Sequence, residues 1–334
     1  MIKIGVIKEG KTPPDERVPF CPEQVNYINA NFPDVKVVVQ KSDVRRYKNE
    51  EFQNQGIELV DNLDDCNVLM GIKEVPIADL IPNKTYFFFS HTIKKQAYNR
   101  KLLIELLDKK IAMVDYETLV DKNGSRLIGF GRYAGIVGCY NTFFAYGQRT
   151  GLFNLKRAYQ CFDKTEMLNE LPKIKLPNDY KIVITGGGRV AKGIIEILEK
   201  LNIQKVKPAD FLSNTYCYPV YTQLFPEDYN KRKNNQPFTV REFYADASGF
   251  ESNFMPYAKV ADMYISGHFW AKGSPFIFTR EDAKSPDFKI KVVGDISCDI
   301  DGPVACTIRP SCIKEPIYGY HPTTEQETEF NNPE

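Results

Sequence analysis

The 334-residue sequence has no long hydrophobic run, no clustered metal-binding motif and no excess of one charge. The apolar run 86–89 is far below the roughly 20 apolar residues that a membrane helix needs. The eight cysteines include no Cys-x-x-Cys pair, and the three histidines include no pair at metal-ligand spacing. Forty-four basic and 43 acidic side chains give a net charge of only +1, which is too small an excess to attract nucleic acid or an anionic membrane. We therefore expect reduced thiols, no metal, and a small-molecule partner, without nucleic acid or membrane; a homo-oligomer is compatible with this composition.

The N-terminus lacks a basic leader and a cleavage site, because a strand-like pattern begins at residue 2. This predicts a cytoplasmic location. A content of 43% hydrophobic and 26% charged residues is typical of a globular protein. The length exceeds what one hydrophobic core usually serves, which predicts two domains.

Short apolar runs alternate with amphipathic stretches over the first 130 residues. This alternation predicts parallel βαβ units in a doubly wound sheet, and a similar alternation follows residue 180. The predicted strands are residues 2–7, 35–39, 68–72, 85–89, 111–115, 180–185, 205–206, 263–265 and 291–295; the predicted helices are residues 22–30, 49–55, 94–108, 133–149 and 189–201.

The predicted fold class is therefore α/β, with two doubly wound Rossmann-like domains and an interdomain cleft. Residues 1–132, together with a tail of about 305–334, are expected to form the N-terminal catalytic domain. Residues 133–304 are expected to form the dinucleotide-binding domain, entered through a connector helix rich in small residues. The polar segment 225–252 is expected to be a solvated loop.

A glycine fingerprint, G-x-G-x-x-G/A, follows the strand that ends at residue 185 and opens a helix. Gly186 permits the tight turn, Gly188 lets the backbone approach a pyrophosphate, and Ala191 permits close helix packing. The helix N-terminus, with Arg189 and Val190, would face the phosphates. The alternative is that this turn is only a sharp strand-to-helix connection.

Asp210 lies 22 residues after Gly188, where a carboxylate could bind the adenosine ribose. Because an acidic residue would repel a 2′-phosphate, NAD is favoured over NADP. The nearby Lys205 and Lys207 keep NADP open.

Polar residues suited to proton transfer follow three predicted strands of the first domain. Lys73 and Glu74 follow residues 68–72, His91 follows residues 85–89, and Glu117 follows residues 111–115. Because the carboxyl ends of parallel strands share one sheet edge, these side chains are expected to meet there. Alone, the lysine would be read as a surface residue and the histidine as a structural one.

Two arginines in the first domain are candidates for binding a substrate carboxylate through a bidentate contact. Arg17 follows the first strand within a proline-rich turn, and Arg126 follows the turn at residues 123–124. A surface role is the alternative for each.

Several motifs resemble one superfamily of amino-acid dehydrogenases. Residues 5–9 and 15–20 look like the opening of the alanine dehydrogenase and transhydrogenase N-terminal domain. Residues 71–76, 89–96 and 129–135 are more similar to the saccharopine-forming and saccharopine-cleaving enzymes of lysine metabolism, and the resemblance spans nearly the whole chain. Residues 294–302 and 317–322 resemble lysine 2-oxoglutarate reductase in particular.

The resemblance implies an NAD(P)-dependent oxidoreductase that cleaves or forms a C–N bond between an amino acid and a 2-oxo acid, with saccharopine, lysine and 2-oxoglutarate as reactants. It implies Lys73 and His91 as the acid-base pair and a bound NAD. By the same resemblance Arg17 and Arg126 are substrate-carboxylate ligands, Glu74 and Glu117 are acidic neighbours that tune the pair, and Asp295 lies near nicotinamide and substrate. The alternatives are an alanine dehydrogenase that uses pyruvate and ammonia, and a non-catalytic dinucleotide-binding or transhydrogenase-like protein.

Overall fold

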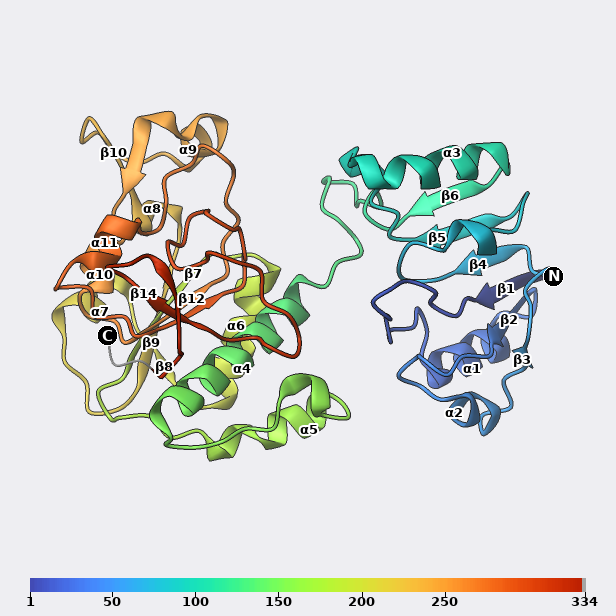
Figure 1. Ribbon diagram of the computed structural model, residues 1–334, viewed down its shortest axis with the longest axis horizontal. Helices are drawn as coiled ribbons and strands as arrows, with labels where there is room; N and C mark the ends of the chain where they lie inside the picture. The colour runs from blue at the N-terminus through green and yellow to red at the C-terminus, as the bar shows by residue number, and fades with distance from the viewer. Residues whose placement is uncertain (332–334) are drawn as a thin grey trace. The chain divides into compact units, whose positions relative to one another are not determined.

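The computed structural model describes residues 1–331, which form two compact units (Figure 1). The first unit is Met1–Gly129, and the second begins at Phe130. The boundary lies three residues before the one expected from the sequence. Each unit contains its own parallel sheet and its own cores, so each is described separately.

The first unit is built on a six-stranded parallel sheet in the order β3-β2-β1-β4-β5-β6. The order reverses direction between β1 and β4, which is the point where doubly wound sheets bind ligands. Its elements are β1 (Ile2–Val6), α1 (Pro22–Asn31), β2 (Val35–Gln40), α2 (Asn49–Gln53), β3 (Leu59–Val60), β4 (Val68–Met70), β5 (Thr85–Phe88), α3 (Arg100–Asp108) and β6 (Ala112–Asp115).

Alternate residues of each strand serve two separate cores in the first unit. Val38 faces the core that contains Leu102 and Leu106 of α3, whereas Val37 faces the core of α1 and α2. The period of two along the strand therefore places α3 on one face of the sheet and α1 with α2 on the other.

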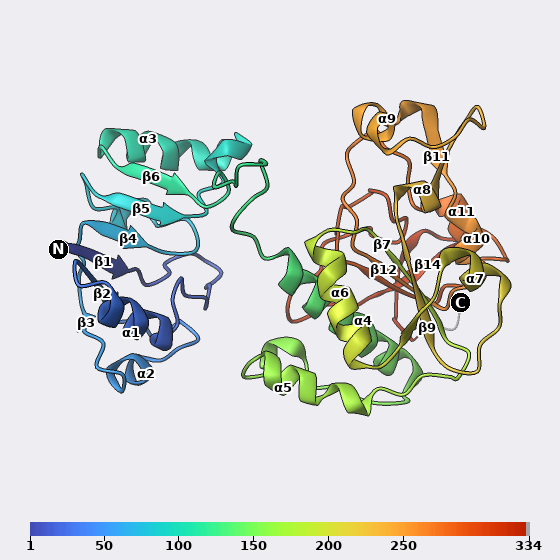
Figure 2. The same cartoon turned by 180° about the vertical axis from the view of Figure 1, so that it is seen from behind.

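The second unit holds a five-stranded parallel sheet in the order β13-β12-β7-β9-β8 (Figure 2). The helices α4 and α6 pack on one face, and α7, α8 and α10 pack on the other. The bounds are α4 (Gly131–Thr150), α5 (Lys164–Asn169), β7 (Lys181–Thr185), α6 (Arg189–Lys200), β8 (Gln204–Lys205), α7 (Pro208–Ser213), β9 (Val220–Leu224), α8 (Pro226–Tyr229), β10 (Asn230–Arg232), α9 (Val240–Ala245), β11 (Phe250–Ser252), α10 (Met255–Ala258), β12 (Met263–Ser266), α11 (Arg280–Lys284), β13 (Val292–Asp295), β14 (Gly319–His321) and β15 (Gln326–Thr328).

The helices α4 and α6 approach each other backbone to backbone, as the small residues of the sequence predicted. A Cβ atom on Gly135 would lie 2.0 Å from the carbonyl oxygen of Val190, and one on Gly193 would lie 2.0 Å from that of Arg132. Only glycine fits at either position. This contact fixes the start of α6, which carries the glycine fingerprint, against α4.

Two segments of the second unit differ from the expectation. Residues 225–252 form α8, β10, α9 and β11 rather than one irregular loop, and the rings of Phe238, Phe243 and Phe250 cluster between them. The described part of the tail belongs to the second unit, whereas it was expected to join the first. Arg149 Nη1 on α4 donates to the carbonyl oxygen of Phe330 at 2.9 Å. This long-range contact has no signature in the local sequence pattern.

Candidate active site

Four strand ends of the first unit gather charged side chains at one edge of the sheet. Glu9 follows β1, Lys73 and Glu74 follow β4, His91 follows β5, and Glu117 follows β6. The prediction that Lys73, Glu74, His91 and Glu117 meet at this edge agrees with the geometry described next.

Lys73 and His91 are in direct contact. Lys73 Nζ lies 3.3 Å from His91 Nε2, and the His91 side chain is only 15% exposed. The backbone of His91 adopts a left-handed conformation with φ of 56°, which is uncommon for a residue other than glycine. This conformation turns the imidazole at the end of β5 toward β4.

The other ring nitrogen of His91, Nδ1, lies close to both a carboxylate and an ammonium group. His91 Nδ1 lies 3.0 Å from Glu117 Oε2 and 3.1 Å from Lys94 Nζ. A protonated Nδ1 donates to Glu117, whereas an unprotonated Nδ1 accepts from Lys94, so the two contacts belong to different tautomers. With the proton on Nδ1, the lone pair of Nε2 faces Lys73.

Glu74 is held by Lys11, a residue that the sequence analysis did not single out. Lys11 Nζ lies 2.8 Å from Glu74 Oε2, and Glu74 Oε1 lies 3.9 Å from His91 Nε2 without a hydrogen-bond partner among the described residues. Burial is the largest single effect and acts to raise the pKa of Glu74, but the hydrogen bond and charge of Lys11, a backbone hydrogen bond and the charge of His91 together lower it. Glu74 therefore stays ionised beside the histidine.

The amine of Lys73 has a lowered pKa. Burial is the main cause, and the positive charges of Lys11 and Arg17 add to it, whereas Glu74 opposes it. Burial is the largest single effect on Glu117 and acts to raise its pKa, but the hydrogen bonds and the charges of His91 and Lys94 together lower it. The cluster thus combines one ammonium group that loses its proton more readily than usual with two carboxylates that remain charged.

Glu9 supports the segment that carries Lys73. Its carboxylate accepts hydrogen bonds from the backbone N–H groups of Ile72 at 2.6 Å and Lys73 at 3.0 Å. Burial raises the pKa of Glu9 despite these two bonds. The sequence analysis missed Glu9 as a site residue, although the Lys-Glu pair after the first strand was part of the resemblance.

The structure places the two candidate arginines differently. Arg17 forks onto Asp15, with Nε 2.9 Å from Oδ1 and Nη2 2.6 Å from Oδ2, and Arg126 Nη2 lies 3.7 Å from Glu117 Oε1. Their side chains are 43% and 49% exposed, so both guanidinium groups reach solvent. Arg126 adjoins the histidine cluster directly, whereas Arg17 acts on Lys73 through its charge.

The glycine loop of the second unit fits a pyrophosphate. Gly186 has φ of 96°, and a Cβ there would lie 2.4 Å from the carbonyl oxygen of Gly267, so the turn requires glycine. A Cβ on Gly188 would meet no described atom within 4 Å, which leaves space above the N-terminus of α6. Ala191 is fully buried beneath. Together these features match the geometry that lets a phosphate approach backbone N–H groups.

The structure does not bring Asp210 to this loop. Asp210 is an exposed residue of α7, which follows β8, and β8 lies at the sheet edge with β9 between it and β7. The expected role of Asp210 requires the strand after α6 to lie beside β7. Because the chain places that strand outside β9, the acidic residue after it lies one strand too far away.

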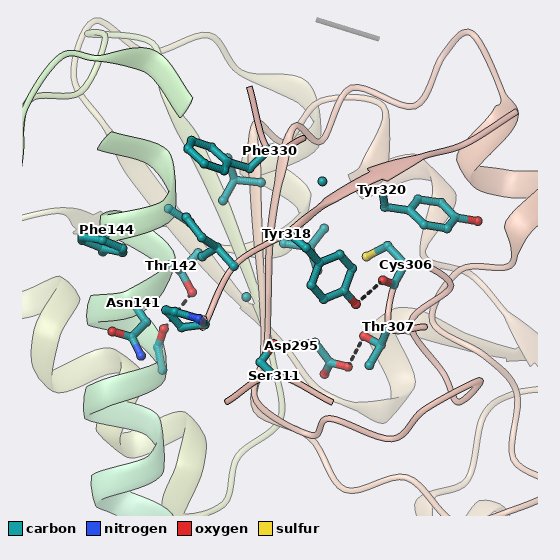
Figure 3. A pocket seen from close by; sticks show the side chains of 18 of the residues that line it. Asn141, Thr142, Phe144, Asp295, Cys306, Thr307, Ser311, Tyr318, Tyr320 and Phe330 are labelled. Carbon is teal, nitrogen blue, oxygen red and sulfur yellow. Dashed lines mark hydrogen bonds between the residues drawn. The ribbon is translucent and has the colours of Figure 1, made fainter. Parts of the chain in front are cut away.

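Asp295 lies at the carboxyl end of β13 and is held by hydroxyl groups. Ser266 Oγ and Ser297 Oγ donate to Oδ1, each at 2.5 Å, and Thr307 Oγ1 donates to Oδ2 at 2.5 Å. Asp295 also lines a cavity of about 760 Å³ within the second unit, where α4 faces the C-terminal segment that carries Tyr318 (Figure 3). Tyr318 closes this wall by donating its hydroxyl to the carbonyl oxygen of Cys306 at 2.7 Å.

Two expected absences concern metals and membranes. Among residues 1–331, no three His, Cys, Asp or Glu side chains are grouped so that they could hold a metal ion. None of the helices in that range has the length and apolar character needed to cross a membrane. The cytoplasmic location stays a prediction.

The fold is α/β with two parallel Rossmann-like sheets, and comparisons with known proteins find dehydrogenases among the similar chains. Residues 5–137 match the family model of the alanine dehydrogenase/PNT N-terminal domain. The chain is 29% identical over 351 residues to the mitochondrial alpha-aminoadipic semialdehyde synthase of Bos taurus, covering 92% of this chain and 37% of the relative. It is 23% identical over 311 residues to saccharopine dehydrogenase [NAD(+), L-lysine-forming] of Schizosaccharomyces pombe, covering 87% of this chain and 74% of the relative. The resemblance inferred from the sequence motifs is thus confirmed.

Solved structures show the same fold. L-alanine dehydrogenase superposes with a TM-score of 0.53 at 15% identity, covering 84% of this chain and 70% of that one. A transhydrogenase from Sinorhizobium meliloti gives 0.52 at 12% identity, covering 86% and 76%. The chain spans little more than a third of the semialdehyde synthases that it matches.

Proposed function

We propose that the protein is a nicotinamide-dinucleotide-dependent oxidoreductase that acts on the C–N bond of an amino-acid adduct, with saccharopine, lysine and 2-oxoglutarate as its reactants. The contact between Lys73 and His91 is the observation that carries this proposal. Similarity to a lysine-forming saccharopine dehydrogenase over 87% of the chain supports the reaction class. The glycine loop supports the cofactor, which when bound accepts or supplies the hydride.

In the oxidative direction the chain's residues would move two protons. His91 takes the proton from the substrate's secondary amine as the hydride leaves the adjacent carbon, which gives an imine. Lys73 then activates the water that adds to this imine, and collapse of the adduct releases a free amine and a 2-oxo acid. Two bases with different pKa values suit these separate steps.

The geometry suits a division of labour between these two bases. Nζ and Nε2 are 3.3 Å apart, so only one proton can occupy the line between them. When His91 is protonated, Lys73 is favoured as the free base, and Glu117 stabilises the imidazolium through Nδ1. Arg126 and Arg17 reach solvent beside these groups and would bind substrate carboxylates.

The name of the fungal relative gives NAD as its cofactor, and NAD is our primary assignment. Asp210 does not lie at the glycine loop and so does not select between NAD and NADP. NADP is therefore the alternative to be measured. Gly186, Gly188, Arg189, Val190 and Ala191 form the loop and helix start that would hold the pyrophosphate.

A direct test supplies purified protein and a reduced dinucleotide with either 2-oxoglutarate plus lysine or pyruvate plus ammonia, and follows absorbance at about 340 nm. We expect consumption with the first pair only. Consumption with pyruvate plus ammonia would make the protein an alanine dehydrogenase. Tight dinucleotide binding without turnover on any pair would make it a non-catalytic binding protein.

Variants separate the two sites. Lys73→Met and His91→Gln are expected to lower turnover while leaving dinucleotide affinity unchanged. Gly188→Ala is expected to weaken dinucleotide binding by tenfold or more without changing the melting temperature, since its Cβ would meet no described protein atom. Full turnover in the first two variants would refute the assigned roles.

A further inference from the structure

Phe225 lies at the end of the strand next to the glycine loop. In the register of β7 with β9, Thr185 is opposite Leu224, and the backbone N–H of Gly186 donates to the carbonyl oxygen of Leu224 at 2.9 Å. Phe225 is the next residue along and follows the carboxyl end of β9. In dinucleotide folds this position, at the end of the strand beside the glycine loop, carries the residue that meets the adenosine ribose.

The ring of Phe225 packs on the glycine loop, and the ring is also partly exposed to solvent. A Cβ on Gly187 would lie 2.7 Å from Phe225 Cε1, so the ring rests directly on the loop backbone. The residue is nevertheless 41% exposed. An aromatic face fixed against the phosphate-binding loop and open to solvent can stack on a base.

The nearby carboxylate of Asp228 has another role, whereas Glu227 is exposed to solvent. Asp228 Oδ2 accepts the backbone N–H of Phe225 at 2.8 Å, so that carboxylate caps α8. The loop is backed by an amide and an ammonium instead, because Gln223 Nε2 donates to the carbonyl oxygen of Gly186 at 2.9 Å and Lys205 Nζ donates to Gln223 Oε1 at 2.7 Å. The side chains of Gln223 and Lys205, which back the loop, therefore carry no acid.

We propose that Phe225 holds the adenosine half of the dinucleotide by stacking on its base, in place of a carboxylate that binds the ribose hydroxyls. This inference rests on the proposed function, because it requires a dinucleotide at the glycine loop. A stacked ring does not read the ribose 2′-position. The protein consequently discriminates less between NAD and NADP than a fold with an acidic residue at this place.

The test measures binding by calorimetry on the full chain, with 5′-AMP and inorganic pyrophosphate as separate probes. Phe225→Ala is expected to weaken 5′-AMP binding by about fivefold or more, the usual effect of removing one stacking side chain. Pyrophosphate binding should not change. Tyr218→Ala is the matched control, since Tyr218 is 43% exposed and precedes the opposite end of β9.

A second variant tests the consequence for specificity. Phe225→Asp places a carboxylate where the adenosine ribose is expected, so it should accept the ribose hydroxyls of NAD and repel the 2′-phosphate of NADP. We expect the ratio of NAD to NADP affinity to rise at least tenfold over the wild type. An unchanged ratio would overturn the placement of the adenosine half.

The remaining outcomes are distinguishable. If the wild type binds NAD but Phe225→Ala binds 5′-AMP as tightly as the wild type does, this inference fails and the proposed function stands. If Phe225→Ala weakens 5′-AMP and pyrophosphate equally, the ring only shapes the loop and the inference fails. If the wild type binds neither NAD nor NADP, both fail. Circular-dichroism melting checks folding, and Phe225→Leu replaces the alanine variant if the latter does not fold.

Discussion

Replacing Gly135 by alanine should destabilise the second unit and weaken its dinucleotide site at once. The added Cβ would lie 2.0 Å from the carbonyl oxygen of Val190 and 3.0 Å from Cα of Gly193. Every atom that it meets is backbone, so no side-chain rotation relieves the clash. An ordinary Cβ contact begins at 3.4 Å, and α4 and α6 must therefore separate by about 1.4 Å.

The magnitude follows from two opposing effects. Overpacking at a rigid contact costs up to about 3 kcal/mol, and alanine in place of glycine inside a helix returns about 1 kcal/mol. The expected net loss in the free energy of unfolding is about 2 kcal/mol, which lowers the melting temperature by roughly 4–8 °C in a unit of this size. Because Val190 belongs to the start of α6, the same movement displaces the glycine loop and should weaken dinucleotide affinity several-fold.

The assay is calorimetric melting with and without NAD. Gly249→Ala is the control, because a Cβ at Gly249 would have no described atom within 4 Å and should leave both quantities unchanged. A melting temperature of Gly135→Ala equal to that of the wild type would refute the close backbone contact between the two helices.

Three further predictions concern buried charges. Glu9→Ala leaves the N–H groups of Ile72 and Lys73 without their acceptor, so it should lower the free energy of unfolding in urea by about 2 kcal/mol. Glu9→Gln should lose less, and equal losses in the two variants would refute the role of the carboxylate. Glu74→Gln removes a negative charge that raises the pKa of Lys73, and the pKa of Lys73 should therefore fall further. The rising limb of the pH–rate profile for the oxidative reaction should then move to lower pH by on the order of one pH unit. A shift to higher pH would contradict this. Lys181→Met leaves the carbonyl oxygens of residues 211 and 214 without their ammonium donor, which lies 2.7 and 2.8 Å away. It should lower the free energy of unfolding by about 2 kcal/mol. Melting without dinucleotide measures this loss, and no change would refute the role of the ammonium.

Much of the fold could be predicted from local pattern alone. Strands β1, β2, β4, β5, β6 and β7 and helices α1, α4 and α6 occur within a few residues of the predicted ranges, because hydrophobic periodicity reports burial directly. Strand β9 was missed although all five of its residues are buried. A strand that is buried on both faces does not alternate apolar and polar residues along its length. The sequence pattern therefore gives little indication that it is a strand.

Strand order was the part that local pattern could not supply. The strand β8, at residues 204–205, was predicted, but nothing in its composition shows that β9 lies between it and β7. The misplacement of Asp210 follows directly from this. The same limitation applies to the tail, whose contacts with α4 join residues 181 positions apart.

The candidate active site was predictable where residues directly follow strands. Lys73, Glu74, His91 and Glu117 each stand at such a position, and parallel strands must end together. Lys11 and Lys94 were missed because they lie further along their loops, where backbone turns decide the direction of a side chain. Lys94 stands three residues after His91, whose backbone adopts a positive φ, and its Nζ lies 3.1 Å from Nδ1.

The contact of Gly135 with Val190 makes the orientation of the phosphate-binding turn depend on helical phase some fifty residues earlier in the chain. Deleting one residue of α4 between Gly135 and Arg149, which contacts the tail, rotates one of these two contacts by about 100° relative to the other. Length changes in this helix should consequently be far less tolerated than point substitutions on its solvent side.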